Sequence, residues 1–272
     1  MDELNKDSIP AAVKAILERL AKTIQISATA PDQYDCEICH DTGMVPVTDE
    51  DGVVRQARCE CYQRKRAERL LKASGLADVI DQQTFDTFVT ETPTQQIVKQ
   101  KAEQYLADLL KAREEWNPRA PWFYIGGNPG SGKTHICTAI CGELLKRNIG
   151  VKYMKWVEES KRLKFNVRDD DFDELVEEYA TVSVLYIDDL LKQRYTRNPE
   201  FTEADIKIAF TILNERYIRN KPTIISSEWD LIRDLLPADE GVFSRVYERT
   251  KGHLVNISRN RESNFRMREV GS

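Results

Sequence analysis

The sequence contains no long hydrophobic run and no leader of the type that directs export. No window approaches eighteen uninterrupted apolar residues, the length at which a segment becomes a candidate for a membrane-spanning helix. The first residues, MDELNKDSIP, are acidic and polar, whereas an export signal has a basic start followed by an apolar core. We therefore expect a cytoplasmic protein with no membrane partner.

An excess of positive charge is also missing. The 272 residues include 40 Lys and Arg against 45 Asp and Glu, which gives a formal net charge of −5. A protein that attracts nucleic acid over its whole surface is strongly basic, so any contact with DNA must be made by a local cluster. Internal repeats and low-complexity tracts are missing as well, and the length suits one large domain with one small domain.

Cysteine is scarce outside one short segment. Four of the six cysteines lie between residues 36 and 61, and the other two, Cys137 and Cys141, are spaced for one face of a helix. In a chain without an export signal, clustered cysteines indicate a metal site before they indicate disulfides. The separate pair is typical of small apolar residues on a buried helix face.

The four clustered cysteines form two close pairs, Cys36 with Cys39 and Cys59 with Cys61, and a glycine-containing stretch of hairpin length separates them. Two such pairs can surround Zn²⁺ tetrahedrally, and the binding free energy helps to fold a segment that has little apolar core. We predict a structural zinc held by these four residues, with His40 as a possible substitute ligand. The alternative is a set of unmetallated cysteines.

Helical patterns and one irregular stretch suggest how the chain is divided. Residues 10–26 carry an apolar helical stripe, which packs either on its own domain or on a partner, and a basic helix follows the cysteines and ends at Gly75. The next stretch lacks a sustained period. We predict a zinc-binding domain over residues 1–80, a linker over 81–95 and a larger domain over 96–272.

Five apolar, strand-like runs alternate with helical patterns in the larger domain. The runs read PWFYIGG, VKYMKW, VSVLYIDD, KPTIISSE and HLVNIS. Nearly continuous apolar strands separated by helices are typical of a parallel sheet covered on both faces. The sequence therefore predicts an α/β fold with a five-stranded parallel sheet.

A phosphate-binding loop follows the first of these runs. Gly127, Gly132, Lys133 and Thr134 fit the pattern G-x-x-x-x-G-K-[ST] between a strand and a helix. The glycines permit a tight loop whose N–H groups face phosphate oxygens, the lysine reaches the β- and γ-phosphates, and the threonine holds Mg²⁺. We expect ATP and Mg²⁺ here, within a site made of the residues Gly127, Asn128, Pro129, Gly130, Ser131, Gly132, Lys133, Thr134, His135 and Asp188.

A buried strand ends in two carboxylates, Asp188 and Asp189. The first can hold the Mg²⁺ shell and the second can polarise an attacking water, which favours hydrolysis over simple nucleotide binding. In the alternative, Asp189 caps the following helix. Another strand ends with Ser226, Ser227 and Glu228, at the sheet edge where ligands bind.

Two arginines, Arg245 and Arg249, lie one helical turn apart in the segment GVFSRVYERTKG. Their spacing alone is compatible with a role at the nucleotide site or with salt bridges at the surface.

Together these motifs resemble the bacterial and phage replicative-helicase loaders, the DnaC/DnaI-like branch of the AAA+ ATPases. The resemblance runs from about residue 36 to the end, and its most specific part is Thr202 to Ile257. The segments that carry it are CECYQRKRAERLLKASGL, GNPGSGKTH, LYIDDL, FTEADIKIAFTILNERYIRNKPTIISSE and SRVYERTKGHLVNI.

The resemblance implies an AAA+ P-loop domain without a C-terminal helical lid, and it assigns roles to individual residues. Asp188 matches the metal-binding acid and Asp189 the catalytic acid, where a glutamate is usual; the shorter arm would slow turnover. Arg245 matches the arginine finger that a neighbouring subunit inserts, and Arg249 matches a second, sensor-like arginine. Ser227 or Glu228 falls where an asparagine sensor is common.

Initiator-type relatives have an additional helix between the second and third strands that lines the path of a single DNA strand. The corresponding segment here, WVEESKRLKFNVRDDDFDELVEEY, is long enough for two helices. This comparison nominates basic residues as DNA contacts, namely Lys161, Arg162, Lys164 and Arg168. A solvated helix face is the alternative, and the arginine-rich tail is a further candidate.

The resemblance implies a loader whose ATP-bound subunits self-associate and place a DnaB-type replicative helicase on single-stranded DNA during replication initiation. It also makes residues 1–80, with the zinc site, the helicase-interacting domain. One alternative is an IstB-like transposition helper ATPase, and another is an adaptor that binds ATP without hydrolysing it. The predicted zinc domain favours the loader, because IstB-like proteins generally lack one.

Overall fold

The structure, a computed structural model, describes residues 34–49, 51–117, 119–166, 171–192 and 202–258. The chain divides into two compact units, Met1–Tyr62 and Gln63–Ser272. The predicted helix over residues 10–26, Arg168 and the arginine-rich tail lie outside the described residues. The division falls earlier than the predicted domain boundary at residue 80. Which segments act independently stays a prediction.

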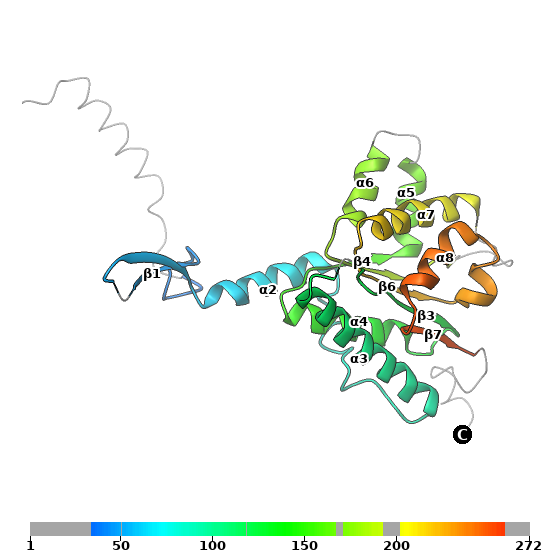
Figure 1. The fold of residues 1–272 in the computed structure, drawn as a ribbon, viewed down its shortest axis with the longest axis horizontal. Coiled ribbons are helices and arrows are strands. Elements are labelled where there is room, and N and C mark those ends of the chain that lie inside the picture. Colours follow the sequence, from blue (N-terminus) through cyan, green and yellow to red (C-terminus); the bar gives the residue numbers. More distant parts are fainter. Residues whose placement is uncertain (1–33, 50, 118, 167–170, 193–201, 259–272) are drawn as a thin grey trace, which may run out of the picture. The chain divides into compact units, whose positions relative to one another are not determined.

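The first unit contains an antiparallel hairpin of β1 (Met44–Thr48) and β2 (Val54–Arg58), the first two strands drawn in Figure 1. Its two strands connect the cysteine pairs, as the spacing predicts. Helix α2 (Cys61–Ser74) begins at the last cysteine, and Gly75, which follows it, has a φ of 78°. A positive φ at this position is the usual way to end a helix, because glycine adopts it without a steric penalty.

The second unit is built on a five-stranded sheet in the order β4-β5-β6-β3-β7, and each neighbouring pair is parallel. The α/β prediction and all five predicted strands are confirmed. The strands are β3 (Phe123–Gly127), β4 (Val151–Lys155), β5 (Val184–Asp188), β6 (Thr223–Ser227) and β7 (Leu254–Ile257). Because the strands are parallel, their carboxyl ends form one edge, where the phosphate loop, Asp188 and Glu228 meet.

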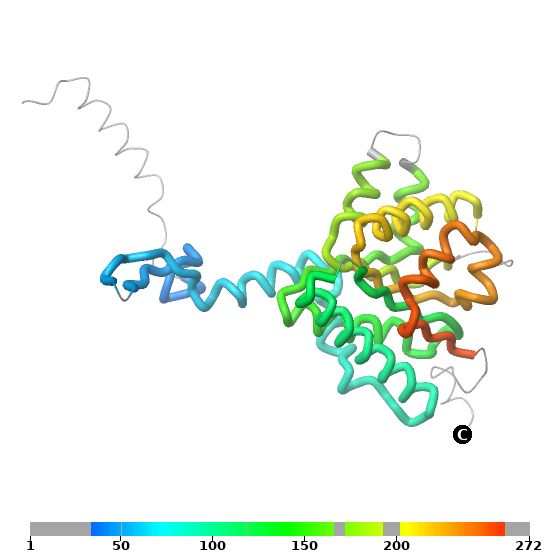
Figure 2. Tube along the Cα trace, in the orientation of Figure 1, coloured from blue at the N-terminus to red at the C-terminus, as the bar shows by residue number. Residues whose placement is uncertain are grey.

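Helices cover both faces of this sheet, as Figure 1 shows, and the chain trace in Figure 2 follows the crossovers between strands. One face packs against α3 (Pro93–Glu114) and α4 (Lys133–Lys146). The other packs against α5 (Trp156–Asn166), α6 (Asp171–Ala180), α7 (Glu203–Ile218), the π-helix η2 (Leu231–Leu235) and α8 (Glu240–Arg249). The segment between β4 and β5 forms two helices, as expected.

The strands explain why two apolar cores form. Successive side chains of a strand point to opposite faces, so in β3 Phe123 and Ile125 enter one core while Tyr124 enters the other. Cys137 and Cys141 are completely buried in the core beneath α4, which confirms the interpretation of that pair.

The segment between α2 and α3 belongs to the core of the second unit. Leu76, Ile80 and Phe88 are buried against α3 and α4, with Phe85 packed beside them. The predicted linker over residues 81–95 therefore contributes apolar side chains to the ATPase core, although its backbone is irregular.

Candidate nucleotide-binding site

The phosphate loop joins the end of β3 to the start of α4, and its glycines are required by its path. Gly127, Gly130 and Gly132 have positive φ values of 124°, 75° and 82°. A Cβ on Gly127 would lie 2.1 Å from the carbonyl oxygen of Ile257, which belongs to the adjacent β7. A side chain at this position would force the loop and β7 apart.

Lys133 is 6% exposed and its ammonium group is held inside the loop. Its Nζ donates hydrogen bonds to the carbonyl oxygens of Gly127 at 2.9 Å and Asn128 at 2.6 Å. Burial lowers the pKa of Lys133, while the carboxylates of Asp189 and Glu228 oppose this effect. The positive charge thus lies beside the N-terminus of α4, where the helix amides favour an anion.

Asp188 is fixed by hydroxyl groups from four elements. Its Oδ1 accepts hydrogen bonds from Tyr186 at 2.7 Å, Ser226 at 2.5 Å and Thr134 at 3.2 Å, and its Oδ2 accepts one from Tyr153 at 2.8 Å. The hydroxyl of Thr134 and the carboxylate of Asp188 are therefore adjacent. A hydroxyl and a carboxylate so placed fit the oxygen ligands of Mg²⁺ beside a nucleotide.

Asp189 occupies a left-handed backbone conformation, with a φ of 57°. Its N–H donates to Ser226 Oγ at 3.0 Å, and its carboxylate accepts a hydrogen bond from Lys192 at 2.9 Å rather than from the start of a helix. Burial raises the pKa of Asp189, and the neighbouring charge of Asp188 raises it further. Such a carboxylate is suited to accept a proton from water.

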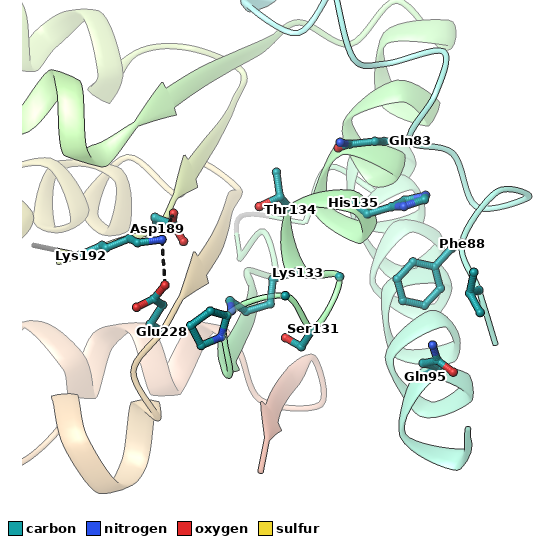
Figure 3. Close-up of a pocket in the computed structure, with 14 residues that line it drawn as sticks. Gln83, Phe88, Gln95, Ser131, Lys133, Thr134, His135, Asp189, Lys192 and Glu228 are labelled. Carbon is teal, nitrogen blue, oxygen red and sulfur yellow. Dashed lines mark hydrogen bonds and ion pairs between the residues drawn. The ribbon is translucent and has the colours of Figure 1, made fainter. Parts of the chain in front are cut away.

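The phosphate loop and Asp189 line one cavity of about 340 Å³. Figure 3 shows Asp189, Lys192 and Glu228 on one side of Lys133, and Phe88, Gln95 and His135 on the other. The cavity is large enough for a nucleotide-sized ligand. Of the residues at the predicted sensor position, Glu228 lines the cavity, whereas Ser227 donates to the carbonyl of Leu190 at 2.8 Å.

The wall formed by Gln83, Phe88, Val89 and Gln95 was not predicted from the sequence. The ring of Phe88 lies beside Gly132, where an added Cβ would be 3.0 Å from a ring carbon, and contacts His135 edge-on at 5.3 Å. The ring of His135 also lies 2.9 Å from the carbonyl oxygen of Thr84. The sequence signal for this wall was a pair of phenylalanines, Phe85 and Phe88, within an otherwise polar stretch.

Lys192 is a second functional candidate that sequence reasoning missed. Burial alone would lower the pKa of Lys192, but hydrogen bonds to Glu228 and Asp189 raise it above its ordinary value. Its position four residues after Asp188 gave no motif by which to recognise it.

The structure does not place Arg245 or Arg249 among the residues that line the cavity. Arg245 lies on α8, where its guanidinium donates to the Gly241 carbonyl and lies 5.8 Å from the ring centroids of Phe210 and Tyr217. Arg249 donates to the Tyr217 carbonyl at 3.0 Å and stacks on that ring. Their predicted roles in hydrolysis stay predictions.

The basic residues nominated for DNA contact lie partly in ion pairs. In α5, Lys164 pairs at 2.6 Å with Asp205, which is 1% exposed and accepts a hydrogen bond from the backbone N–H of Thr202, the N-cap of α7. Arg162 lies 3.5 Å from Glu159. Lys161 is exposed on the same helix. The pairing of Lys164 shows a structural role that the sequence pattern did not reveal.

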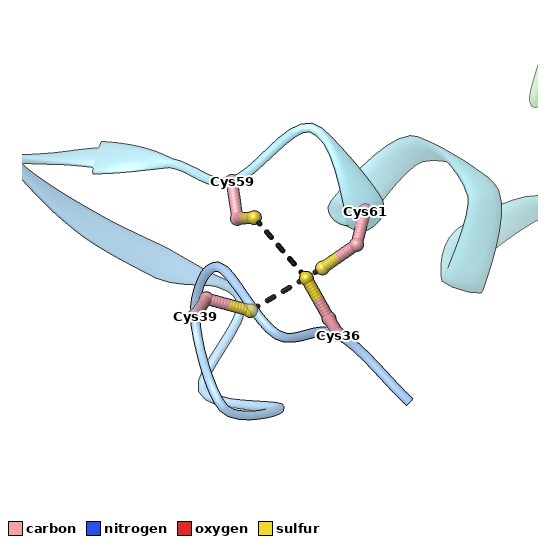
Figure 4. Close-up of side chains that lie close together, drawn as sticks. All are labelled: Cys36, Cys39, Cys59 and Cys61. Carbon is pink, nitrogen blue, oxygen red and sulfur yellow. Dashed lines mark hydrogen bonds between the residues drawn. The ribbon is translucent and has the colours of Figure 1, made fainter. Parts of the chain in front are cut away.

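The four cysteines of the first unit converge on one point, as Figure 4 shows. Their sulfur atoms all lie within 4.8 Å of one another, and all four side chains are buried. The Cys39 N–H lowers the pKa of Cys36 to about 6, whereas the Cys39 thiol raises that of Cys61 to about 12. Four adjacent thiolates repel one another, so this donor set fits a cation such as Zn²⁺. His40 instead stacks on Tyr34.

Within the described ranges, no helix has the length and apolar character needed to cross a membrane.

Comparisons with known proteins agree with this geometry. A family model for the bacterial DnaA ATPase domain matches residues 80–237. The Bacillus subtilis (strain 168) phage-like element PBSX protein XkdC is 32% identical over 231 residues, which cover 83% of each chain. The uncharacterized protein YqaM of the same strain is 34% identical over 203 residues, covering 74% of this chain and 63% of YqaM.

Two further matches are helicase loaders. The replicative helicase loader DnaC of Escherichia coli (strain K12) is 28% identical over 144 residues, covering 52% of this chain and 56% of DnaC. A crystal structure of the DnaC helicase loader superposes with a TM-score of 0.51 at 21% identity, covering 65% of this chain and 98% of that chain. This structural likeness concerns the fold. The chain spans less than two thirds of the length of YqaM and of the Escherichia coli protein.

Proposed function

Because the chain belongs to the bacterial DnaA ATPase domain family, we propose that it is an ATP-dependent loader that places a DnaB-type replicative helicase on single-stranded DNA. The observation that carries the ATP-dependent part is the cavity that Lys133, Thr134 and Asp189 line together. The likeness to a protein named replicative helicase loader supports the biological role.

The proposed chemistry assigns one task to each side chain. Lys133 and the loop amides bind the β- and γ-phosphates, and Thr134 and Asp188 would hold Mg²⁺, which neutralises phosphate charge when bound. Asp189 orients a water molecule and takes its proton. The water oxygen then bonds to the γ-phosphorus as the bond to the β,γ-bridging oxygen breaks, which gives ADP and phosphate.

The zinc-bearing unit is proposed as the part that holds the helicase. Its hairpin and first turn carry exposed apolar side chains, with exposed fractions of 66% for Ile38, 48% for Val47, 52% for Val53 and 65% for Val54. Exposed apolar residues grouped in a small unit are typical of protein-binding surfaces. Residues 34–49 and 51–62 of this unit include no phosphate-binding loop.

Retention on an immobilised replicative helicase tests this division of tasks. The wild-type chain should be retained, with stronger retention in ATP. Cys59→Ser should lose retention yet bind ATP, because its nucleotide cavity is intact, whereas Lys133→Ala should lose the effect of ATP. Equal retention of the wild type and Cys59→Ser would remove the helicase role from the zinc unit.

Arg245 is proposed to act in trans, on ATP held by a neighbouring subunit of an ATP-bound assembly. The absence of Arg245 from its own cavity lining supports this placement. An arginine that neutralises charge on the γ-phosphate is typically worth about 10³–10⁵-fold in hydrolysis rate. Arg245→Ala should therefore bind ATP but hydrolyse it poorly.

Mixing Arg245→Ala with Lys133→Ala should restore part of the hydrolysis, since one protein supplies a working cavity and the other a working finger. If mixed assemblies form and remain as inactive as either protein alone, Arg245 has no role in trans.

A further inference from the structure

Lys192 bridges two acidic residues that come from different strands. Its ammonium lies 2.9 Å from the Asp189 carboxylate, which follows β5, and 2.8 Å from Oε1 of Glu228, which follows β6. All three side chains line the nucleotide cavity with Lys133, and Figure 3 shows them grouped beside one another. The side chains are 35%, 29% and 26% exposed, so solvent only partly screens these interactions.

The two lysines of the cavity differ in what they contact. Lys133 is held by carbonyl oxygens of the phosphate loop, whereas Lys192 is held by carboxylates. Lys133 is therefore placed to bind phosphate. Lys192 is placed to hold Asp189, the acid that the proposed hydrolysis requires.

The carboxylate of Asp189 has fewer side-chain hydrogen-bond partners than that of Asp188. Four hydroxyl groups hold the carboxylate of Asp188. Among the described residues, the side-chain partner found for the Asp189 carboxylate is Lys192. The N–H of Asp189 is fixed by Ser226, but this bond leaves rotation about the side-chain bonds free.

Removal of Lys192 would leave the Asp189 carboxylate exposed to repulsion by two neighbouring carboxylates. The charges of Asp188 and Glu228 act unfavourably on that of Asp189, and the cation between Asp189 and Glu228 offsets this repulsion. A misplacement of about 1 Å in a reacting group can cost about a hundredfold in rate. The short aspartate arm offers little room to compensate.

We propose that Lys192 is a positioning residue for ATP hydrolysis, which keeps the Asp189 carboxylate directed at the γ-phosphate end of the cavity, and that Glu228 anchors Lys192. This inference rests on the proposed hydrolysis of ATP. Lys192 acts through Asp189, so its removal changes the chemical step more than the binding of ATP.

Steady-state hydrolysis by the full chain with helicase and single-stranded DNA tests this role. Lys192→Met should lower kcat by about tenfold and leave the KM for ATP within about twofold, because the phosphate contacts remain. Lys192→Gln should show a similar loss, and Lys192→Arg should recover part of the rate. Glu228→Gln should reduce kcat less, and adding it to Lys192→Met should cause no further loss.

Lys152→Met is the matched control. Lys152 is 30% exposed and pairs with Glu178 at 2.5 Å, outside the residues that line the nucleotide cavity. Lys152→Met should leave kcat and the KM for ATP unchanged. Thermal unfolding of each variant separates a loss of folded protein from a loss of rate.

Several results would overturn the role of Lys192 while leaving the proposed function intact. These are an unchanged or faster kcat in Lys192→Met, a change confined to KM, or additive losses with no recovery in Lys192→Arg, provided that the wild type hydrolyses ATP. If the wild type hydrolyses no ATP with both partners present, the hydrolytic part of the proposed function fails and the role of Lys192 fails with it.

Discussion

The four-cysteine unit and the ATPase unit are stabilised by different means. In residues 34–49 and 51–62, the buried side chains are the four cysteines, with Val45 packed beside them. The ATPase unit instead has an apolar core on each face of its sheet. A unit of the first kind depends on a metal for its fold, whereas a unit of the second kind folds by burying apolar surface. The same chain should therefore respond to metal removal in one part alone.

The largest expected effect follows removal of zinc. Structural zinc sites contribute about 10–16 kcal/mol of apparent binding free energy, so Cys59→Ser or strong chelation should unfold the hairpin. We expect one Zn²⁺ per wild-type chain by elemental analysis, and less than a tenth of this in Cys59→Ser. The thermal unfolding of the ATPase unit should change little. Equal zinc contents in the two proteins would contradict the assignment of zinc to the four cysteines.

A smaller effect is expected from a cysteine of the other unit. Cys137 is completely buried beneath the sheet and is not part of the four-cysteine cluster. Cys137→Ala should destabilise the ATPase unit by about 1–2 kcal/mol, from a small cavity, and should keep its zinc. Denaturant unfolding followed by tryptophan fluorescence measures the first effect. A loss of zinc in this variant would show that the two units do not respond separately.

Local patterns predicted most of the fold and part of the site. The strands β3 to β7 are apolar runs whose type can be identified without knowing their partners. The phosphate loop and the pair Asp188 and Asp189 are short motifs whose spacing reflects direct contact with a nucleotide. These features depend on residues that are neighbours in the sequence.

The rest of the cavity depends on contacts between distant segments. Phe88 lies beside Gly132 because the irregular stretch before α3 packs on α4, and its sequence offers no period that predicts this. Lys192 meets Glu228 because β5 and β6 are neighbours in the sheet. Lys164 pairs with the buried Asp205 because α5 packs against α7, although the resemblance to initiator-type relatives nominated Lys164 for DNA contact. These contacts depend on the order of the strands and on the packing of the helices. Neither can be predicted from a single motif.

Loading of a replicative helicase onto circular single-stranded DNA tests the central claim most directly. The helicase, the DNA and the chain are combined with ATP, and the DNA-bound helicase is separated by gel filtration and quantified. We predict that the wild type increases DNA-bound helicase several-fold over helicase alone. Lys133→Ala should not do so because it lacks the phosphate contact, and Cys59→Ser should not because its helicase-binding unit is unfolded. An amount of DNA-bound helicase that is the same with and without the wild-type chain would contradict the account.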